Sequence, residues 1–235
     1  GSILAVQLLV YLVGVTDPHR AIGTSALAVA VNAFANLLPH ARAGHVHWKA
    51  ATLFAAAGVV GASAGSTAGK AFDGQRLLTL FALLMIVIAV LMQRPRHNAD
   101  SPLTELRPAT IARLLGVGFA TGVLAGFFGI GGGFLVVPGL ILAAGLPTLH
   151  AIGSSLVAVG AFGLTTATNY AVSGLVDWRI AALFIAGGVA GGALGAALAS
   201  HLSKGKQTLN RVFGGVLVLV ALYMLAHSSG VLHLQ

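Results

Sequence analysis

The chain contains a succession of long apolar segments, and these constrain its fold more than any other feature. Each is about 17 to 23 residues long, and a helix of that length spans the hydrocarbon core of a bilayer, which is about 30 Å thick. Hydrophobic residues make up 57% of the chain and charged residues 8%, which leaves too little polar surface for a soluble globular protein. The full-length apolar segments are residues 21–39, 50–70, 77–93, 112–130, 149–171, 179–200 and 209–226. We therefore predict an all-α, polytopic membrane protein.

The sequence also repeats itself, with corresponding motifs about 130 residues apart. The segment Ala21-Ile22-Gly23-Thr24-Ser25 returns as Ala151-Ile152-Gly153-Ser154-Ser155, and Trp48-Lys49 returns as Trp178-Arg179. In both copies this Trp and the basic residue after it stand at the start of a glycine-rich apolar run. Many secondary transporters consist of two such copies, and the substrate binds where the copies meet. The repeat therefore bears on function as well as on fold.

The basic residues predict the orientation of the chain in the membrane. Two further apolar runs, 3–13 and 133–145, are too short to span a bilayer alone. If both runs cross, nine Lys and Arg residues lie on one side and four on the other, whereas if both dip in and return, the split is seven against six. Only the first arrangement obeys the positive-inside rule. It places on the cytoplasmic side Arg42, Lys49, Arg94, Arg96, Arg107, Arg113, Lys204, Lys206 and Arg211.

The crossing number predicts how the two copies are related. If the helix that we expect to be missing before Gly1 is counted, each copy has five crossings. Five is an odd number, so the second copy is predicted to be inverted relative to the first. We divide the chain into a first transmembrane repeat at 1–93, a cytoplasmic linker at 94–111 and a second transmembrane repeat at 112–235. The chain begins inside the repeat pattern and without Met, so we expect a helix equivalent to 112–130 to be missing before Gly1. We attribute the net charge of +8 to membrane orientation rather than to nucleic acid binding.

The sharpest local motif is Gly129-Ile130-Gly131-Gly132-Gly133, between a full-length apolar run and a short one. Consecutive glycines form helices poorly and free the backbone to break and turn. An irregular backbone at membrane depth is tolerated where it is buried in protein or lines a wet cavity, and the N-terminus of the short helix that follows would attract anions. The alternative is that these glycines only permit close helix packing. We expect that packing role for Gly61, Gly65, Gly69, Gly118, Gly122, Gly126, Gly187, Gly188, Gly191, Gly192 and Gly195.

The repeated Ala-Ile-Gly-Thr/Ser-Ser motif opens the next apolar helix in each copy. A glycine followed by two hydroxyls in a first helical turn offers backbone N–H and side-chain O–H donors without a fixed charge. Such donors suit an oxyanion that must also leave, but ordinary helix capping is an alternative role. Farther along the same two helices, Asn32 and Asn169 either face a substrate or form hydrogen bonds between helices.

In their duplicated order, these motifs resemble the TauE/SafE family of sulfite exporters and related sulfur-anion permeases. The resemblance rests on the Gly129–Gly133 motif with Pro138, on the two Ala-Ile-Gly motifs and on the paired Trp48-Lys49 and Trp178-Arg179, and it covers essentially the whole chain. It implies a permease of the bacterial inner membrane that moves small sulfur-containing anions such as sulfite, thiosulfate, sulfonates or sulfoacetate. The first copy departs from the family because Gln7 stands where the proline falls, so its short helix breaks differently or Gln7 itself donates to the substrate.

We predict that this permease works by alternating access between two inverted halves, with short discontinuous helices after the glycine breaks. Arg20 is expected to draw anions into the outer vestibule. The predicted substrate-binding residues are Gly131, Gly132, Gly133, Gly153, Ser154 and Ser155 in the second copy and Gly1, Ser2, Gln7, Gly23, Thr24 and Ser25 in the first, with Arg20, Asn32 and Asn169.

Other chemistry is absent from the sequence. There is no HExxH, P-loop, nucleophile elbow or carboxylate pair, so we expect neither an enzyme nor a bound cofactor. The chain has no cysteine, and His40, His45 and His47 lie in a basic loop without an acidic partner, so we expect no metal site. All five acidic residues fall in loops or at helix ends, which leaves no mid-membrane carboxylate to carry a coupling ion. The alternatives to a permease are an anion channel and a non-transporting membrane assembly subunit. The sequence is also compatible with a homodimer in the bilayer.

Overall fold

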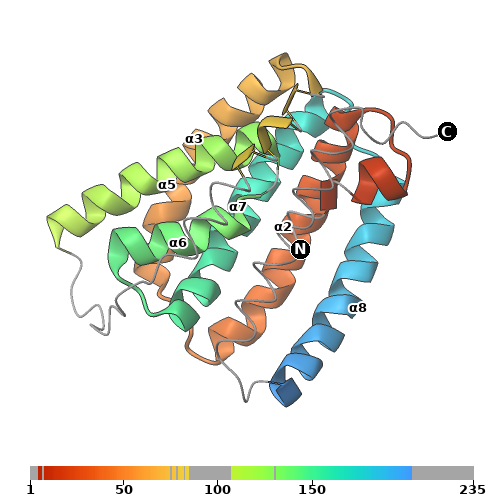
Figure 1. Cartoon of the computed structure of the whole chain (residues 1–235). Coiled ribbons are helices and arrows are strands. Elements are labelled where there is room, and N and C mark those ends of the chain that lie inside the picture. The colour runs from red at the N-terminus through yellow and green to blue at the C-terminus, as the bar shows by residue number, and fades with distance from the viewer. Residues whose placement is uncertain are drawn as a thin grey trace. The chain divides into compact units, whose positions relative to one another are not determined.

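The computed structural model consists of helices joined by loops (Figure 1). It describes residues 5, 6, 8–74, 76, 77, 79–81, 83, 84, 107–129 and 131–202. Within these residues there is no β-strand, so the all-α prediction is confirmed. The elements are the short π-helix η1 (Leu8–Leu12) and the α-helices α2 (Pro18–Arg42), α3 (Trp48–Ala71), α5 (Pro108–Phe128), α6 (Gly133–Ala144), α7 (Thr148–Val172) and α8 (Trp178–Leu202).

Four of the helices, α2, α3, α5 and α7, are long and apolar enough to cross a membrane. In addition, α8 covers the predicted run 179–200 and α6 covers the predicted short run 133–145. The predicted runs 77–93 and 209–226 lie mostly or entirely outside the described residues. The polytopic helical membrane fold predicted from the sequence is therefore confirmed.

The chain divides into two compact units. Unit 1 is Gly1–Ala71 with Asn98–Val189, and unit 2 is Phe72–His97 with Ala190–Gln235. Unit 1 combines helices from both sequence copies, because α2 and α3 belong to the first copy and α5, α6, α7 and the start of α8 belong to the second. All contacts described below lie within unit 1.

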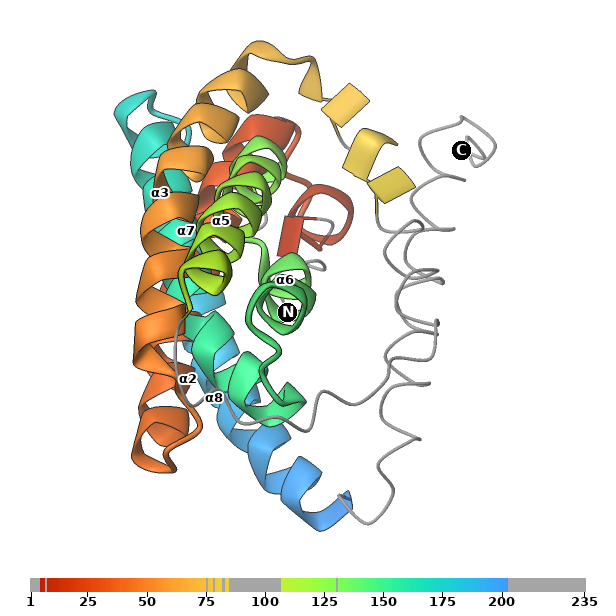
Figure 2. The same cartoon turned by 90° about the vertical axis from the view of Figure 1, so that its left-hand side faces the viewer.

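Helices α3 and α5 run parallel at close range, and glycines make this approach possible (Figure 2). A Cβ added at Gly118 would lie 2.6 Å from the Phe54 carbonyl oxygen, and one added at Gly61 or Gly65 would collide with the α5 backbone. Backbones can approach this closely only where side chains are absent or small. The predicted packing role of the glycines on these two helices is therefore confirmed.

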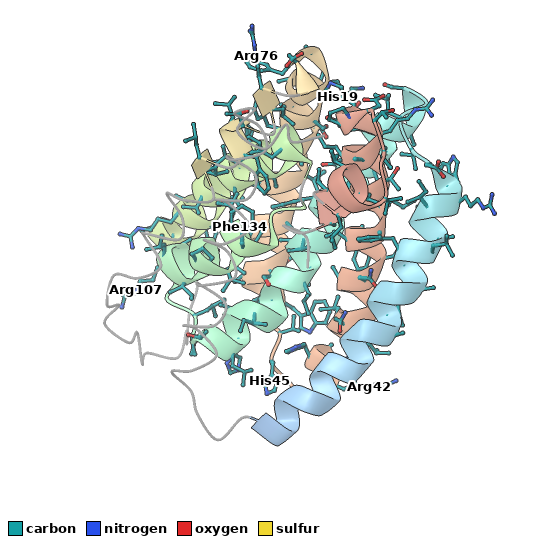
Figure 3. All side chains as sticks on the ribbon, turned by 45° about the vertical axis from the view of Figure 1, so that its right-hand side comes forward. His19, Arg42, His45, Arg76, Arg107 and Phe134 are labelled. Atoms are coloured by element: carbon teal, nitrogen blue, oxygen red, sulfur yellow. The ribbon has the colours of Figure 1, made fainter. Side chains whose placement is uncertain are left out.

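Helices α2 and α7 pack side by side in opposite directions. Gly23, in the first turns of α2, lies against Tyr170 near the end of α7, and Gly153, in the first turns of α7, lies against His45 just after α2. Figure 3 shows His19 and His45 at opposite ends of these helices, and we name the two ends of unit 1 after them. α2 and α7 are corresponding helices of the two sequence copies, and the inverted relation of the whole copies stays a prediction.

The short helix α6 lies in the hydrophobic core of unit 1. Its Val136 and Leu140 are fully buried together with Phe54 of α3 and Phe162 of α7. The Phe54 and Phe162 rings are stacked with their centroids 6.3 Å apart. This core fixes where α6 begins, which is the feature on which the candidate site depends.

Candidate functional site

The glycine motif breaks the chain between α5 and α6. Gly129, Gly131 and Gly132 have φ values of 67°, 65° and 72°, in the left-handed region that residues with a Cβ rarely occupy. The break reverses the chain, so that Gly132 lies against Ala125, and Gly139, farther along α6, lies against Val117. The predicted break and the short helix that follows it are both confirmed.

The break reaches the middle of the spanning helices. Gly129 lies against Ile22 in the first turns of α2. A Cβ added at Gly131 would lie 2.9 Å from a methyl group of Val29 and 3.7 Å from one of Val159. Since α2 and α7 each have 25 residues, Val29 and Val159 are each one residue before the centre of their helix. Figure 3 shows Phe134, in the first turn of α6, between the His19 and His45 ends.

The first turn of α6 has neither a capping side chain nor an acidic residue. Its N-cap residue is Gly132. A helix N-terminus carries unpaired N–H groups and the positive end of the helix dipole. At this position the positive potential is therefore reduced neither by a capping side chain nor by a carboxylate in the turn.

The first hydroxyl of each repeated motif binds the other copy. The backbone N–H of His47 donates to Ser154 Oγ at 2.8 Å, and the backbone N–H of Asp177 donates to Thr24 Oγ1 at 2.9 Å. His47 and Asp177 immediately precede α3 and α8, so each hydroxyl pairs an N–H at the start of a helix from the opposite copy. Helix capping is the predicted alternative role of these hydroxyls. In the structure each hydroxyl accepts from the start of a helix of the other copy, one at each end of unit 1.

The second hydroxyl of each motif bonds within its own helix. Ser25 Oγ donates to the Ile22 carbonyl at 3.0 Å, and Ser155 Oγ donates to the Ile152 carbonyl at 2.7 Å. The protons of these two hydroxyls are thus already used. In contrast, Ser154 and Thr24 only accept in the described structure, so that their O–H groups are still able to donate. Their contact with a substrate stays a prediction.

The glycines of the two motifs provide room for these links. A Cβ added at Gly153 would lie 2.5 Å from the His45 carbonyl oxygen, and one added at Gly23 would collide with the Leu175 carbonyl. Each glycine therefore lets the loop of the opposite copy approach the helix backbone. Sequence reasoning missed this role, because the contacting loops are far away in the chain.

The two predicted asparagines lie in different surroundings. The Asn32 amide lies against Gly188 of α8, and its Oδ1 has no hydrogen-bond partner among the described residues. The Asn169 amide is saturated, because Lys70 Nζ donates to its Oδ1 at 2.7 Å and its Nδ2 donates to Ser66 Oγ at 2.6 Å. In this conformation Asn169 therefore forms hydrogen bonds between helices, which is the alternative to facing a substrate.

The remaining predicted residues are placed as follows. Gly133 is the first residue of α6, and Arg20 is exposed in the first turn of α2 at the His19 end. Gly1, Ser2 and Gln7 lie outside the described residues. The residues brought together at the break are thus Gly131 and Gly132 with the middle of α2 and α7.

The histidines of the His45 end form a row of rings. The His40 and His45 ring centroids are 5.8 Å apart, and the His45 and His150 centroids are 5.9 Å apart. Within the part of the chain that the structure describes, no group of three or more His, Cys, Asp or Glu side chains is placed to hold a metal ion. The row therefore joins α7 to the segment around the end of α2 by ring contacts.

The distribution of basic residues predicts only that Lys70 is one of the four on the side opposite the cytoplasm. Lys70 Nζ donates to the Asn169 carbonyl at 3.1 Å, to Asn169 Oδ1 at 2.7 Å and to Ser173 Oγ at 2.9 Å. All of these acceptors are neutral. Lysine in the last turn of a glycine-rich apolar helix is a signal that could have drawn attention to this position.

Comparisons with known proteins agree with this fold. The sequence model of the family described as sulfite exporter TauE/SafE matches residues 1–224. A probable membrane transporter protein of Xylella fastidiosa strain Temecula1 is 54% identical over 231 residues, which cover 97% of this chain and 88% of that protein. The probable membrane transporter protein YunE of Bacillus subtilis is 27% identical over 210 residues, covering 80% of this chain and 76% of that protein. No solved structure matches the chain. With a family match over nearly its whole length and a glycine break at the centre of its spans, the chain belongs to the sulfite exporter TauE/SafE family of membrane transporters.

Proposed function

We propose that the protein is a permease of the bacterial inner membrane that moves small sulfur-containing anions, of the sulfite, thiosulfate, sulfonate or sulfoacetate type, by alternating access. The family description names sulfite and so supports a small sulfur-containing anion as the substrate, and the bacterial relatives, named probable membrane transporter proteins, support transport across a bacterial membrane. The observation that carries the proposal is the glycine break beside Val29 and Val159, at the centre of α2 and α7. Broken helices at mid-membrane depth are where transporters of this general design bind their substrates.

The chemistry of the break suits an anion that binds and leaves. Backbone N–H groups and a helix dipole compensate for part of the lost hydration of an oxyanion. A fixed positive charge at the same place would hold the anion more tightly and slow its release. We propose that Gly131, Gly132 and Gly133 contact the substrate, and that the free O–H groups of Ser154 and Thr24 donate to it nearer the two ends.

The antiparallel packing of α2 and α7 supports the alternating mechanism. Corresponding helices that run in opposite directions offer equivalent surroundings to a substrate that arrives from either end. The cross-copy bonds at Ser154 and Thr24 lie at opposite ends of this pair. We propose that these bonds hold the two copies in register while other helices move.

A screen of purified protein tests the proposed function. Binding of sulfite, thiosulfate, sulfoacetate, taurine and sulfate is measured by ligand-induced thermal stabilisation, which rises with ligand concentration relative to Kd. Flux into liposomes is then measured for each anion that binds. We expect saturable uptake of at least one sulfur-containing anion and exchange against the same anion inside. Flux that never saturates would indicate the channel alternative, and the absence of binding and flux for the whole panel would refute the permease.

A further inference from the structure

Two hydroxyls of α7 are buried without a partner. The Thr166 and Tyr170 side chains are both 0% exposed, and neither Thr166 Oγ1 nor the Tyr170 hydroxyl has a hydrogen-bond partner in the described part of the chain. Residues four apart lie on one face of a helix, so these two hydroxyl-bearing side chains follow each other along α7. Native proteins rarely leave buried polar groups unpaired, and such groups call for an explanation.

The two residues lie between the glycine break and the His19 end. Phe162, one turn before Thr166, is 3.6 Å from the position of a Cβ added at Gly132. Thr166 is six residues beyond the centre of α7, which corresponds to about 9 Å along the helix. Tyr170 follows one turn later, with its ring centroid 6.3 Å from that of His19 on α2. A path from the His19 end to the break along α7 would therefore pass both residues.

A positive charge accompanies the hydroxyls. Lys70 Nζ lies 6.0 Å from the centroid of the Tyr170 ring. Its three donated bonds go to Asn169 and Ser173, which are neutral, and within the described residues no carboxylate pairs with it. Asp17, at the same end, accepts from the His19 N–H at 2.9 Å as the N-cap of α2. The ammonium therefore contributes a positive potential beside Tyr170, and the Asp17 carboxylate, whose charge also acts on the Tyr170 hydroxyl, opposes part of it.

We propose that the Thr166 and Tyr170 hydroxyls, with the charge of Lys70 beside them, form a second binding station for the oxyanion substrate, between the His19 end and the glycine break. This inference rests on the proposed function. The hydroxyls donate to the anion directly, while Lys70, whose donors are used by Asn169 and Ser173, acts through its charge and so permits release. Because both hydroxyls are buried in this conformation, the station opens only when α3 moves away from α7, while the cross-copy bonds keep α2 and α7 together.

Conservative variants on one helix test the station. Thr166→Val and Tyr170→Phe each remove a hydroxyl with little change in shape. The matched control is Thr168→Val, because Thr168 Oγ1 is exposed and donates to the Leu164 carbonyl at 2.8 Å. Lys70→Gln removes the charge and leaves an amide that is able to donate. Affinities for sulfite, thiosulfate and sulfoacetate are measured by thermal stabilisation of the purified proteins, together with the melting temperature of each unliganded variant.

We expect Thr166→Val and Tyr170→Phe each to weaken binding about tenfold or more, the loss typical of one hydrogen bond to a charged group. Their unliganded melting temperatures should stay level or rise, because the variants remove unpaired buried oxygens. Lys70→Gln should weaken binding of all three anions, and Thr168→Val should match the wild type. If the wild type binds while both hydroxyl variants bind equally well, the station is wrong and the proposed function stands. If the wild type binds none of these three anions and neither taurine nor sulfate, the proposed function fails and the station with it.

Discussion

Replacing Ser154 with alanine removes one of the two equivalent bonds by which the Ala-Ile-Gly motifs join the sequence copies. The variant leaves the His47 N–H, which donates to Ser154 Oγ at 2.8 Å, without its partner. A donor left unpaired in this way costs about 1 to 3 kcal/mol of the free energy of unfolding. The matched control is Ser155→Ala, because Ser155 donates only to the Ile152 carbonyl of its own helix. Alanine is the better helix former, so we expect this control to change stability by about 0.5 kcal/mol or less.

The equivalent bond at the other end gives an independent measurement. Thr24→Ala should cost about as much as Ser154→Ala, because it leaves the Asp177 N–H unpaired. The two sites lie at opposite ends of 25-residue helices, about 25 Å apart along the axis. At that separation the two losses should add to within about 0.5 kcal/mol in the double variant.

Unfolding of the purified variants in mixed micelles with increasing SDS measures these free energies. The reasoning is refuted if Ser155→Ala is as destabilising as Ser154→Ala, or if Ser154→Ala unfolds like the wild type. Anion affinity is measured on the same proteins. Of the two serines, only Ser154 has an O–H group that is still able to donate. We therefore expect Ser154→Ala to lose about tenfold or more in anion affinity and Ser155→Ala to keep the wild-type affinity.

Three further predictions concern the break, the topology and the coupling. Gly132→Ala should abolish transport and destabilise the protein more than Gly44→Ala. Both glycines have a φ of 72°, but only at Gly132 would the new Cβ meet a neighbour, Ala125 at 2.7 Å. Transport assays and unfolding of both variants check this. Single cysteines at residues 43 and 205 should react with an impermeant reagent from the cytoplasmic side only, and labelling of 205 from outside would contradict the inverted repeat. Sulfite flux into liposomes between about pH 6 and 8 should follow the monoanion concentration, because the desolvation penalty rises steeply with charge. Asp17→Asn should keep this pH dependence, since asparagine also caps a helix. An Asp17→Asn variant that loses proton-linked uptake but still exchanges sulfite would refute this prediction.

The sequence by itself determined the elements of this fold. The length and hydropathy of the apolar runs predict α2, α3, α5 and α7 as spans, because the thickness of the bilayer core sets the helix length. The motif from Gly129 to Gly133 predicts the break, because only glycine adopts left-handed φ angles at so many neighbouring positions without strain. The glycine spacing on α3 and α5 likewise predicts their close approach. All of these properties are local in the chain.

Only the tertiary structure decided what each polar side chain does. Ser154 and Ser155 are adjacent and chemically identical, yet one accepts from His47, 107 residues away in the chain, and the other donates within its own turn. In the same way, packing saturates Asn169 through Lys70 of α3 and leaves the nearby Thr166 unpaired. Helical periodicity predicts the face on which a side chain lies, but a hydrogen bond forms only where a partner atom lies within about 3 Å. For Ser154 and Asn169 that partner comes from the other sequence copy, and its position depends on how α2, α3 and α7 pack together.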